Sequence, residues 1–386
     1  MFQLKLSPLR FPTLHRPGSS YRHFISAYYI KPTCIIRRKM SSVSQLKKDY
    51  PWVSNPLIIA APMRVFTGPA LAQAVSSAGG LGFIGPGLKP ESTATDLASL
   101  GEKGEEVGVG FQLWNGDLAK AVEVVGEYKP CACWLFAPLN GQKDIDLWSA
   151  KLRAAHPGIK IWLQIGTVTE ALAAATSSQP PDVLVVQGTE AGGHGRTSDG
   201  ASWTTLLPEI EDTFSAKGLP QIPLVAAGGI SDARGIAAAL SVGASGAAIG
   251  TRFLASTEAR IAKGYQNAVL EASEGGKNTV RTHLYNHLRG TYGWPEEQWA
   301  PRALKNKSWE EHEAGVPFEE LRGKHEDALR KGDAAWGKET GRTATYAGEG
   351  VGLVRTVKSA KDIVVEERQK AREILRRMAG EFGDER

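Results

Sequence analysis

Three short apolar runs between residues 182 and 253 each end directly in a loop that contains glycine. Runs of this length, rich in valine, leucine and alanine, predict buried β-strands. The runs and their loops are residues 182–186 followed by Gln187–Gly195, residues 223–227 followed by Gly228 and Gly229, and residues 246–249 followed by Gly250 and Thr251. Consecutive strands that end in this way predict a common edge at which backbone groups can approach a ligand.

Five similar runs precede these three, and most neighbouring runs are separated by segments whose apolar residues recur with helical spacing. The five runs are residues 57–61, 81–84, 107–111, 132–136 and 160–164. The expected helices are residues 67–78, 118–127, 144–155, 168–176, 202–216, 232–242 with Ser231 as N-cap, and a short helix from near Ser256. Strands that alternate with helices pair in parallel, and eight such units predict an α/β fold, a (β/α)8 or TIM barrel. No Gly-x-Gly-x-x-Gly follows the first strand, which argues against an open dinucleotide-binding sheet.

The charge of the chain is divided unevenly along its length. The net charge of +5 includes ten Lys and Arg residues and no acid within residues 1–48, which leaves 36 basic against 41 acidic residues in the remainder. A body of about −5 excludes a general affinity for nucleic acid. Residues 1–48, basic and acid-free, are typical of a mitochondrial transit peptide. Met40 follows the basic cluster and could start a shorter, cytoplasmic form.

The remaining chain is expected to divide into a barrel and two later segments. We expect the barrel over residues 49–264, an appended helical subdomain over 265–345, and a glycine-rich loop with a C-terminal helix over 346–386 that packs back on the barrel. The C-terminal helix is expected over residues 360–378. No run of 18 apolar residues predicts a membrane span, and neither Cys131 with Cys133 nor the pair His283 and His287 completes a metal site. We therefore expect no metal.

Glycines in the loops after the seventh and eighth strands predict a phosphate site. In (β/α)8 barrels these two loops commonly close on a phosphate, because glycine N–H groups can point at the anion without obstruction by a Cβ atom. Gly228, Gly229, Gly250 and Thr251 are the expected donors. Substrates as well as cofactors carry phosphate, so the glycines alone leave the ligand open.

Three motifs closely resemble those of the nitronate monooxygenase family: residues 187–194, 226–230 and 250–255. The resemblance implies an FMN-dependent barrel that oxidises alkyl nitronates, or nitroalkanes, with O2 to a carbonyl compound and nitrite. FMN-dependent enoyl-ACP reductases share the same motifs, so an NAD(P)H-dependent reductase of enoyl thioesters is the alternative activity. A flavin-binding barrel without turnover is a third possibility. A small-molecule substrate is expected in either enzyme, and a homodimer is left open.

The candidate site residues follow from the resemblance and from position. The resemblance places the turn Ala61, Pro62 and Met63 under the flavin ring, and residues 346–353 over it, with Glu349 where many relatives have glutamine. Gln164 and Gln187 end strands, where their amides could bond the flavin. Gly192 and Gly193 flank His194, whose ordinary pKa near 6.5 suits proton transfer or anion binding. We expect His194 to be catalytic, with Glu190 and Asp199 as possible partners.

Overall fold

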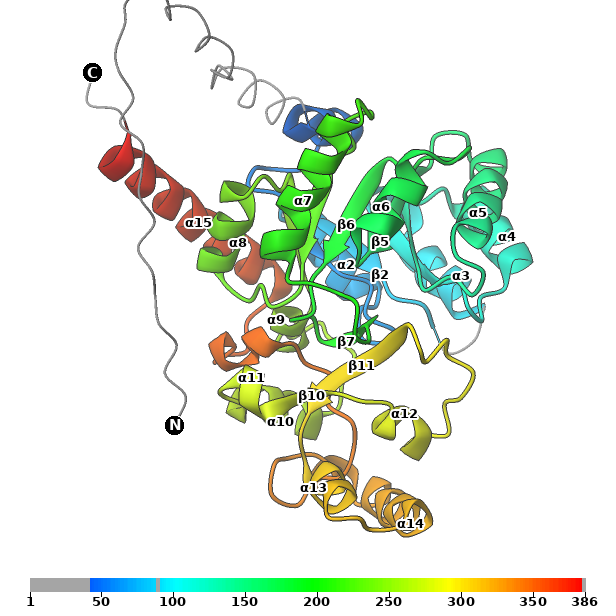
Figure 1. Ribbon diagram of the computed structural model, residues 1–386, viewed down its shortest axis with the longest axis vertical. Helices are drawn as coiled ribbons and strands as arrows, with labels where there is room; N and C mark the ends of the chain where they lie inside the picture. Colours follow the sequence, from blue (N-terminus) through cyan, green and yellow to red (C-terminus); the bar gives the residue numbers. More distant parts are fainter. Residues whose placement is uncertain (1–41, 88–90, 384–386) are drawn as a thin grey trace, which may run out of the picture. The chain divides into compact units, whose positions relative to one another are not determined.

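The computed structural model describes residues 42–87 and 91–383, and these form a closed barrel of eight parallel strands with helices outside it (Figure 1). Around the barrel the strands are β1 (Ile58–Ala60), β2 (Leu81–Ile84), β3 (Gly108–Gln112), β4 (Ala132–Phe136), β5 (Lys160–Ile165), β6 (Val183–Gln187), β8 (Leu224–Ala227) and β9 (Gly246–Ile249). β9 pairs with β1, which closes the sheet. The predicted (β/α)8 barrel is confirmed. Residues 1–41, which make up most of the basic segment with the predicted targeting role, lie outside the described residues.

Alternate residues of each strand separate two apolar layers, as the pleat of a strand requires. In β6, Val183 and Val185 point into the barrel, whereas Leu184 and Val186 pack beneath the surrounding helices. The interior is filled by aromatic rings, with Phe83 5.2 Å from Trp134 and 5.1 Å from Trp162 between ring centroids. The barrel is thus a packed core, and open space is left for a ligand at its mouth.

The helices outside the barrel correspond closely to the expected ones. They are α2 (Pro69–Ser77), α4 (Leu118–Tyr128), α5 (Gln142–Ala155), α6 (Val168–Ala175), α7 (Trp203–Ala216), α8 (Ala233–Ser241) and α9 (Thr251–Leu254). A helix α3 (Glu91–Ala98) and a 3-10 turn η1 (Gly101–Glu106) follow β2 without having been expected. Two predicted details are wrong. Asp232 and not Ser231 caps α8, since its carboxylate accepts from the N–H groups of Arg234 and Gly235, and α9 begins before Ser256.

A helix over residues 42–49 packs against the amino-terminal end of the barrel. Its Leu46 and the following Tyr50 are buried among residues of the barrel interior. The Tyr50 hydroxyl accepts a hydrogen bond of 2.7 Å from the indole N–H of Trp162. The boundary expected after residue 48 therefore falls inside a helix that contributes to the core.

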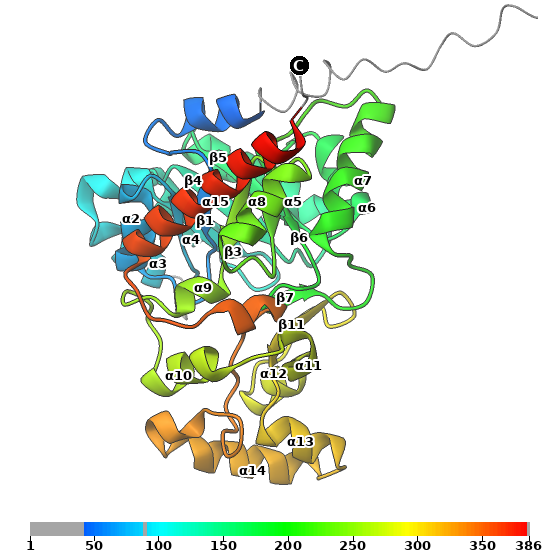
Figure 2. The same cartoon turned by 90° about the vertical axis from the view of Figure 1, so that its left-hand side faces the viewer.

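The C-terminal helix α15 (Ala360–Phe382) runs across the outside of the barrel and packs on α2 and α8 (Figure 2). Glu367 accepts from the backbone N–H of Ala233 at the start of α8, and Arg368 donates to the carbonyls of Pro56 and Ala78. The helix ends at Phe382 and not at residue 378 as expected. Gly380 lies inside its last turn, which is exposed, and glycine there weakens a helix without ending it.

The segment after the barrel is largely helical, but it also contains two strands that periodicity did not predict. Its helices and turns are α10 (Lys263–Glu271), α11 (Gly275–Asn278), α12 (Leu284–Leu288), α13 (Lys307–Glu313), α14 (Phe318–Leu329), η2 (Gly332–Ala335) and η3 (Glu349–Leu353). The strands β10 (Thr279–Arg281) and β11 (Trp299–Leu304) pair antiparallel, and β11 pairs in turn with β7 (Gly193–Arg196) from the barrel's histidine loop. The appended segment is thereby joined to the candidate site by a small sheet (Figure 1).

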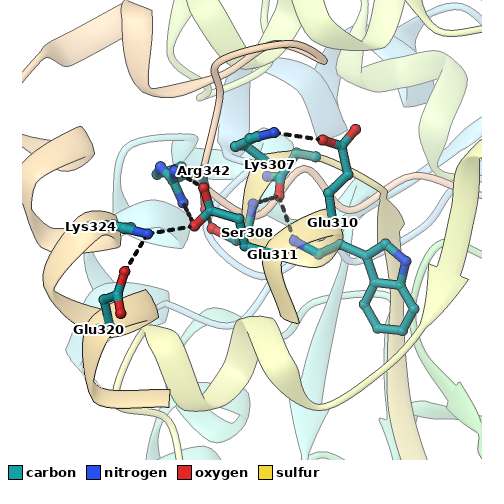
Figure 3. Close-up of polar contacts among 9 residues, drawn as sticks. Lys307, Ser308, Glu310, Glu311, Glu320, Lys324 and Arg342 are labelled. Carbon is teal, nitrogen blue, oxygen red and sulfur yellow. Dashed lines mark hydrogen bonds and ion pairs between the residues drawn. The ribbon is translucent and has the colours of Figure 1, made fainter. Parts of the chain in front are cut away.

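A charged cluster fixes the far end of this segment, where α13 and α14 meet (Figure 3). Both nitrogens at the tip of Arg342 donate to the carboxylate of Glu311, at 2.9 and 2.6 Å, and Lys324 adds a third contact at 3.0 Å. These partners, with Arg342 first, lower the pKa of Glu311 to about 2. The cluster ties the chain just before Tyr346 to α13 and so helps to position the residues that return to the barrel.

Candidate active site

One cavity lies at the carboxyl ends of the barrel strands, with a volume of about 1360 Å³ including the solvent at its mouth. All the residues predicted as catalytic or cofactor-binding line it, whereas the acids proposed as partners of His194 do not. The predicted catalytic and cofactor-binding residues are Ala61, Pro62, Met63, Gln164, Gln187, Gly192, Gly193, His194, Gly228, Gly229, Gly250 and Thr251. The barrel brings them together because parallel strands end on the same face, although the chain separates the first from the last by nearly 200 residues. Their individual roles stay predictions.

Glycines allow three loops of the site to pack backbone against backbone. A Cβ atom on Gly192 would lie 2.4 Å from the backbone nitrogen of Gly348, and one on Gly350 would lie 2.1 Å from the carbonyl oxygen of Gly229. The N–H of Glu349 donates to the carbonyl of Glu190 at 2.9 Å. The C-terminal glycine-rich loop is therefore part of the wall behind the histidine and phosphate loops.

Several backbone N–H groups at the predicted phosphate site have no acceptor within the described residues. Gly228 and Gly229 have φ of 108° and 68°, a region that favours glycine. Within the described residues, no backbone hydrogen bond uses the N–H of Gly229, Ser231 or Thr251 as its donor. Gly229, Ser231 and Thr251 all line the cavity, and N–H groups without an acceptor suit an anion with several acceptor oxygens, such as a phosphate group.

The two predicted glutamines are oriented by neighbouring groups. The indole of Trp134 can only donate, and it donates at 3.0 Å to the side-chain oxygen of Gln164, which leaves the amide NH2 of Gln164 free to donate to a ligand. Gln187 uses its NH2 differently, because that group donates at 3.1 Å to the carbonyl of His194. Gln164 is thus a donor toward the cavity, whereas Gln187 holds the histidine strand in place.

Hydrogen bonds within the turn after β1 hold its backbone at the floor of the cavity. The N–H of Met63 donates to the carbonyl of Ala61 at 2.9 Å, and the hydroxyl of Thr67 donates to the same carbonyl at 3.0 Å. Pro62 fits closely against β3, since a Cβ atom on Gly110 would lie 2.4 Å from its ring. A fixed turn of this kind offers a flat surface on which a planar ring can rest.

His194 lies on β7, opposite Pro301 of β11, and its ring is held on one face and at one nitrogen. The indole of Trp294 stacks on it with ring centroids 3.7 Å apart and planes 7° from parallel. The side-chain nitrogen of Asn286 lies 3.0 Å from its Nε2. Asn286 is thus the partner of His194, and not Glu190 or Asp199 as expected.

Both acids expected to pair with the histidine are engaged elsewhere. Glu190 accepts a hydrogen bond from Ser202, and Asp199 forms an ion pair with Arg196. Glu349, the third acid considered, pairs with Arg302 at 2.9 Å and does not line the cavity. The carboxylates thus support the loops and leave the cavity without negative charge.

The surroundings of His194 keep its imidazole neutral. Burial lowers its pKa well below the ordinary value of 6.5, and the charges of Arg281, His283, Arg289 and Arg64 lower it further. A neutral ring can donate from one nitrogen and accept at the other.

This lowered pKa predicts a loss of stability in acid. Unfolded histidine takes up a proton near pH 6.5, whereas folded His194 does so only at lower pH, so the unfolded state binds more protons in that interval and the free energy of unfolding falls as pH falls. Urea midpoints measured at about pH 7.5 and about pH 5.5 should drop further for the wild type than for His194→Asn. Equal drops in the two proteins would contradict the lowered pKa of His194 in the folded state.

Sequence reasoning missed the residues that the appended segment contributes. Arg281 is partly buried and donates to the carbonyls of Thr189, Ala191 and Gly193, so it fixes the loop that carries His194. Arg64 and Arg289 line the cavity with His194, and no Asp or Glu of the described chain lines it. Burial lowers the pKa of Arg64, and the nearby charge of Arg289, which is exposed, lowers it further. The cavity is therefore electropositive and suited to anionic ligands.

Neither a metal centre nor a membrane helix is found in the part of the chain that the structure describes. No group of three or more His, Cys, Asp or Glu side chains is placed to hold a metal ion. No helix there is long and apolar enough to cross a membrane.

The fold and the cavity define a (β/α)8 barrel with an electropositive cavity, suited to anionic ligands, at the carboxyl ends of its strands. The sequence model of the family named nitronate monooxygenase matches residues 121–367. The chain is 54% identical over 356 residues to nitronate monooxygenase npaC of Metarhizium robertsii, covering 89% of this chain and 98% of the relative. It is 33% identical to nitronate monooxygenase of Neurospora crassa, covering 95% and 99%.

A solved structure of FabK from Thermotoga maritima has the same architecture, with a TM-score of 0.67 and 27% identity, covering 87% of this chain and 98% of that one. The similarity in sequence to the nitronate monooxygenases is higher and equally complete. The chain belongs to the nitronate monooxygenase family, a family of oxidoreductases.

Proposed function

We propose that this enzyme uses FMN and O2 to oxidise alkyl nitronates to carbonyl compounds and nitrite. One cavity, with no acid in its described lining, contains both the backbone N–H groups of Gly229 and Thr251, which have no acceptor, and the imidazole of His194, which is stacked on Trp294. This combination is the observation that carries the proposal. Two anions must be accommodated, the phosphate of the cofactor and the nitronate. The family, together with this electropositive lining, supports that pairing.

The residues present fit FMN. The glycine loops after β8 and β9 would hold the phosphate, the turn Ala61–Met63 would lie beneath the ring, and the free NH2 of Gln164 would donate to it. When bound, FMN would supply the electron acceptor that oxidation of the nitronate with O2 requires. The protein's own task is to bind the nitronate and to compensate its charge, and His194, Arg64 and Arg289, which all line the cavity, would do so.

Anaerobic mixing tests the activity and separates it from the alternatives. Purified protein is expected to be yellow, and the cofactor that it releases on heating is expected to have the mass of FMN. Ethyl nitronate should bleach the flavin without O2, and NADPH should not. Bleaching by NADPH alone would favour reduction of an enoyl thioester, the alternative that the FabK likeness in fold allows. Bleaching by neither would mean a flavin-binding barrel without turnover.

Mitochondrial delivery by residues 1–39 is part of the proposal, supported by their basic, acid-free composition. A passenger protein fused behind residues 1–39 should reach mitochondria, and the same passenger behind residues 40–78 should not. Failure of the first fusion to arrive there would remove the targeting role.

A chain that begins at Met40 should fold and keep its flavin, because every barrel strand and the helix over residues 42–49 lie after that point. A chain that begins at Pro51 should lose about 3–5 kcal/mol or more of stability, since it lacks the buried side chains of Leu46 and Tyr50. Urea midpoints and flavin content of the two truncated chains measure the difference. An unstable, colourless product from Met40 would show that residues 1–39 belong to the fold.

A further inference from the structure

One hydrogen bond inside the barrel fixes the direction of an amide that lines the cavity. Trp134 of β4 and Gln164 of β5 both point inward, because the pleat of a strand turns every second residue to the same side. The indole nitrogen of Trp134 donates to the side-chain oxygen of Gln164 at 3.0 Å. Trp134 is 2% exposed, so its N–H is a buried donor that needs this acceptor.

The bond can be made with the amide of Gln164 in one orientation only. An indole nitrogen donates and cannot accept, so the amide oxygen must face Trp134 and the NH2 group must face away from it. Turning the amide over would set two donors against each other and leave the buried indole N–H without an acceptor. Gln164 therefore presents its NH2 group and keeps its oxygen occupied.

The NH2 group of Gln164 is open to the cavity. It has no acceptor among the described residues, yet it is not one of the buried atoms left without a partner, and Gln164 lines the cavity. The orienting indole is itself held by packing. Its ring lies 5.2 Å from that of Phe83 and 6.0 Å from that of Trp162, between ring centroids, so Trp134 cannot turn away freely.

A donor that cannot be reversed has a definite effect on a flavin. The pyrimidine part of the flavin ring has acceptors at one nitrogen and two carbonyl oxygens, and a single N–H donor. An NH2 group can pair only with the acceptors. Two-electron reduction at neutral pH adds two electrons and one proton, which leaves one negative charge shared by these acceptors. A hydrogen bond to a charged acceptor is stronger than one to a neutral acceptor, so the fixed donor favours the reduced ring.

We infer that Trp134 is a positioning residue that holds Gln164 as a donor to the pyrimidine part of the flavin, and that this pair raises the reduction potential of the bound FMN. The inference rests on the cofactor of the proposed function and is independent of its substrate. Hydrogen bonds to the ring are one of the means by which a protein tunes a flavin. A higher potential favours the uptake of electrons from the nitronate.

The orientation of the amide can be measured apart from any activity. In the ¹⁵N–¹H spectrum of purified protein labelled at its indole nitrogens, the signal of Trp134, assigned with Trp134→Phe, should move upfield in Gln164→Met because its acceptor is lost. Gln112→Met is the matched control, since Gln112 also ends a strand and lines the cavity, and it should leave the signal in place. An unmoved signal in Gln164→Met would overturn the inference.

The potential of the flavin-loaded protein is the second test. Gln164→Met has similar length and no N–H donor, so it should weaken the binding of reduced relative to oxidised FMN about tenfold, a fall of about 30 mV for a two-electron couple. Trp134→Phe keeps an aromatic ring in the interior but frees the amide to turn. It should lower the same ratio at least about threefold, or about 15 mV. An unchanged potential in either variant would overturn the inference.

Two further variants separate positioning from packing. Trp134→Phe added to Gln164→Met should lower the potential no further, because Trp134 acts only through the amide, and a second fall of equal size would overturn this role. Trp162→Phe is the matched control. Trp162 packs beside Trp134 but donates to Tyr50 and does not line the cavity, so the potential should stay at the wild-type value. A fall equal to that of Trp134→Phe would assign the effect to packing and overturn the inference.

The outcomes distinguish this inference from the proposed function. If the purified protein binds no FMN, the proposed function fails, and the tuning of the flavin fails with it. If FMN is bound and nitronate bleaches it, but the potential is the same in the wild type and the variants, only the inference fails. If Trp134→Phe does not fold, the indole signal and the potential of Gln164→Met still decide.

Discussion

Replacing His194 with asparagine should lower kcat/KM for a nitronate by about 10²–10³-fold, the effect usual for losing one donor aimed at a developing or bound anion. Asparagine is shorter than histidine, so it cannot both reach Asn286 and present a donor to the cavity. It also leaves Trp294 without its stacking partner. Flavin should stay bound, because the expected phosphate and ring contacts come from other loops.

Steady-state and anaerobic single-turnover kinetics separate the possible roles of the histidine. A fall in both kcat and kcat/KM assigns it to stabilising the transition state, whereas a large rise in KM with little change in kcat assigns it to anion binding alone. His156→Asn, at the end of α5 and outside the cavity lining, is the control and should behave as the wild type. Full activity of His194→Asn on every nitronate tried would make this histidine structural.

The barrel could be predicted because each of its strands is a continuous stretch of sequence with a recognisable apolar pattern. Buried parallel strands are continuous apolar runs, and they are recognised without knowledge of their partners. The expected runs over residues 81–84, 132–136 and 246–249 coincide with β2, β4 and β9 to the residue. The site glycines were found for the same reason, since strand ends of a barrel meet on one face whatever their side chains.

The small sheet at the cavity could not be predicted, because nothing local favours its strands. β7 has the sequence Gly-His-Gly-Arg, and two glycines in four residues argue against a strand. It becomes one only because β11, about a hundred residues later, supplies a partner for its backbone. The strand is imposed by tertiary structure.

The immediate partners of His194 were missed for a related reason. Asn286, Trp294 and Tyr346 lie 92 to 152 positions beyond it, in a segment whose sequence shows only helical periodicity and charge. The acids proposed instead, Glu190 and Asp199, were near in sequence, but loop packing turned them away. The sequence thus located the histidine, whereas the orientation of its ring depends on contacts that only the fold creates.

The phosphate site offers the other large effect, because Gly229 lies where backbone donors without acceptors meet. Its φ of 68° is tolerated by aspartate and asparagine better than by most residues, so both substitutions leave a barrel that can fold. A Cβ atom there would lie 3.0 Å from the Cβ of Glu190. Because Gly229 lines the cavity, either side chain would stand beside the backbone N–H groups that are expected to hold the phosphate.

Gly229→Asp should therefore weaken flavin binding about 10³-fold or more, whereas Gly229→Asn should weaken it much less. A unit charge about 4 Å from another at an effective dielectric constant of about 20 costs about 4 kcal/mol, a factor of about 10³, and the phosphate carries nearly two charges. Asparagine has the same shape without the charge, so the difference between the two variants isolates electrostatic repulsion from steric obstruction. Flavin content after purification and titration of the flavin-free proteins with FMN measure both, with far-UV circular dichroism to confirm the fold. Equal losses would indicate obstruction alone, and undiminished flavin in Gly229→Asp would place the phosphate elsewhere in the cavity.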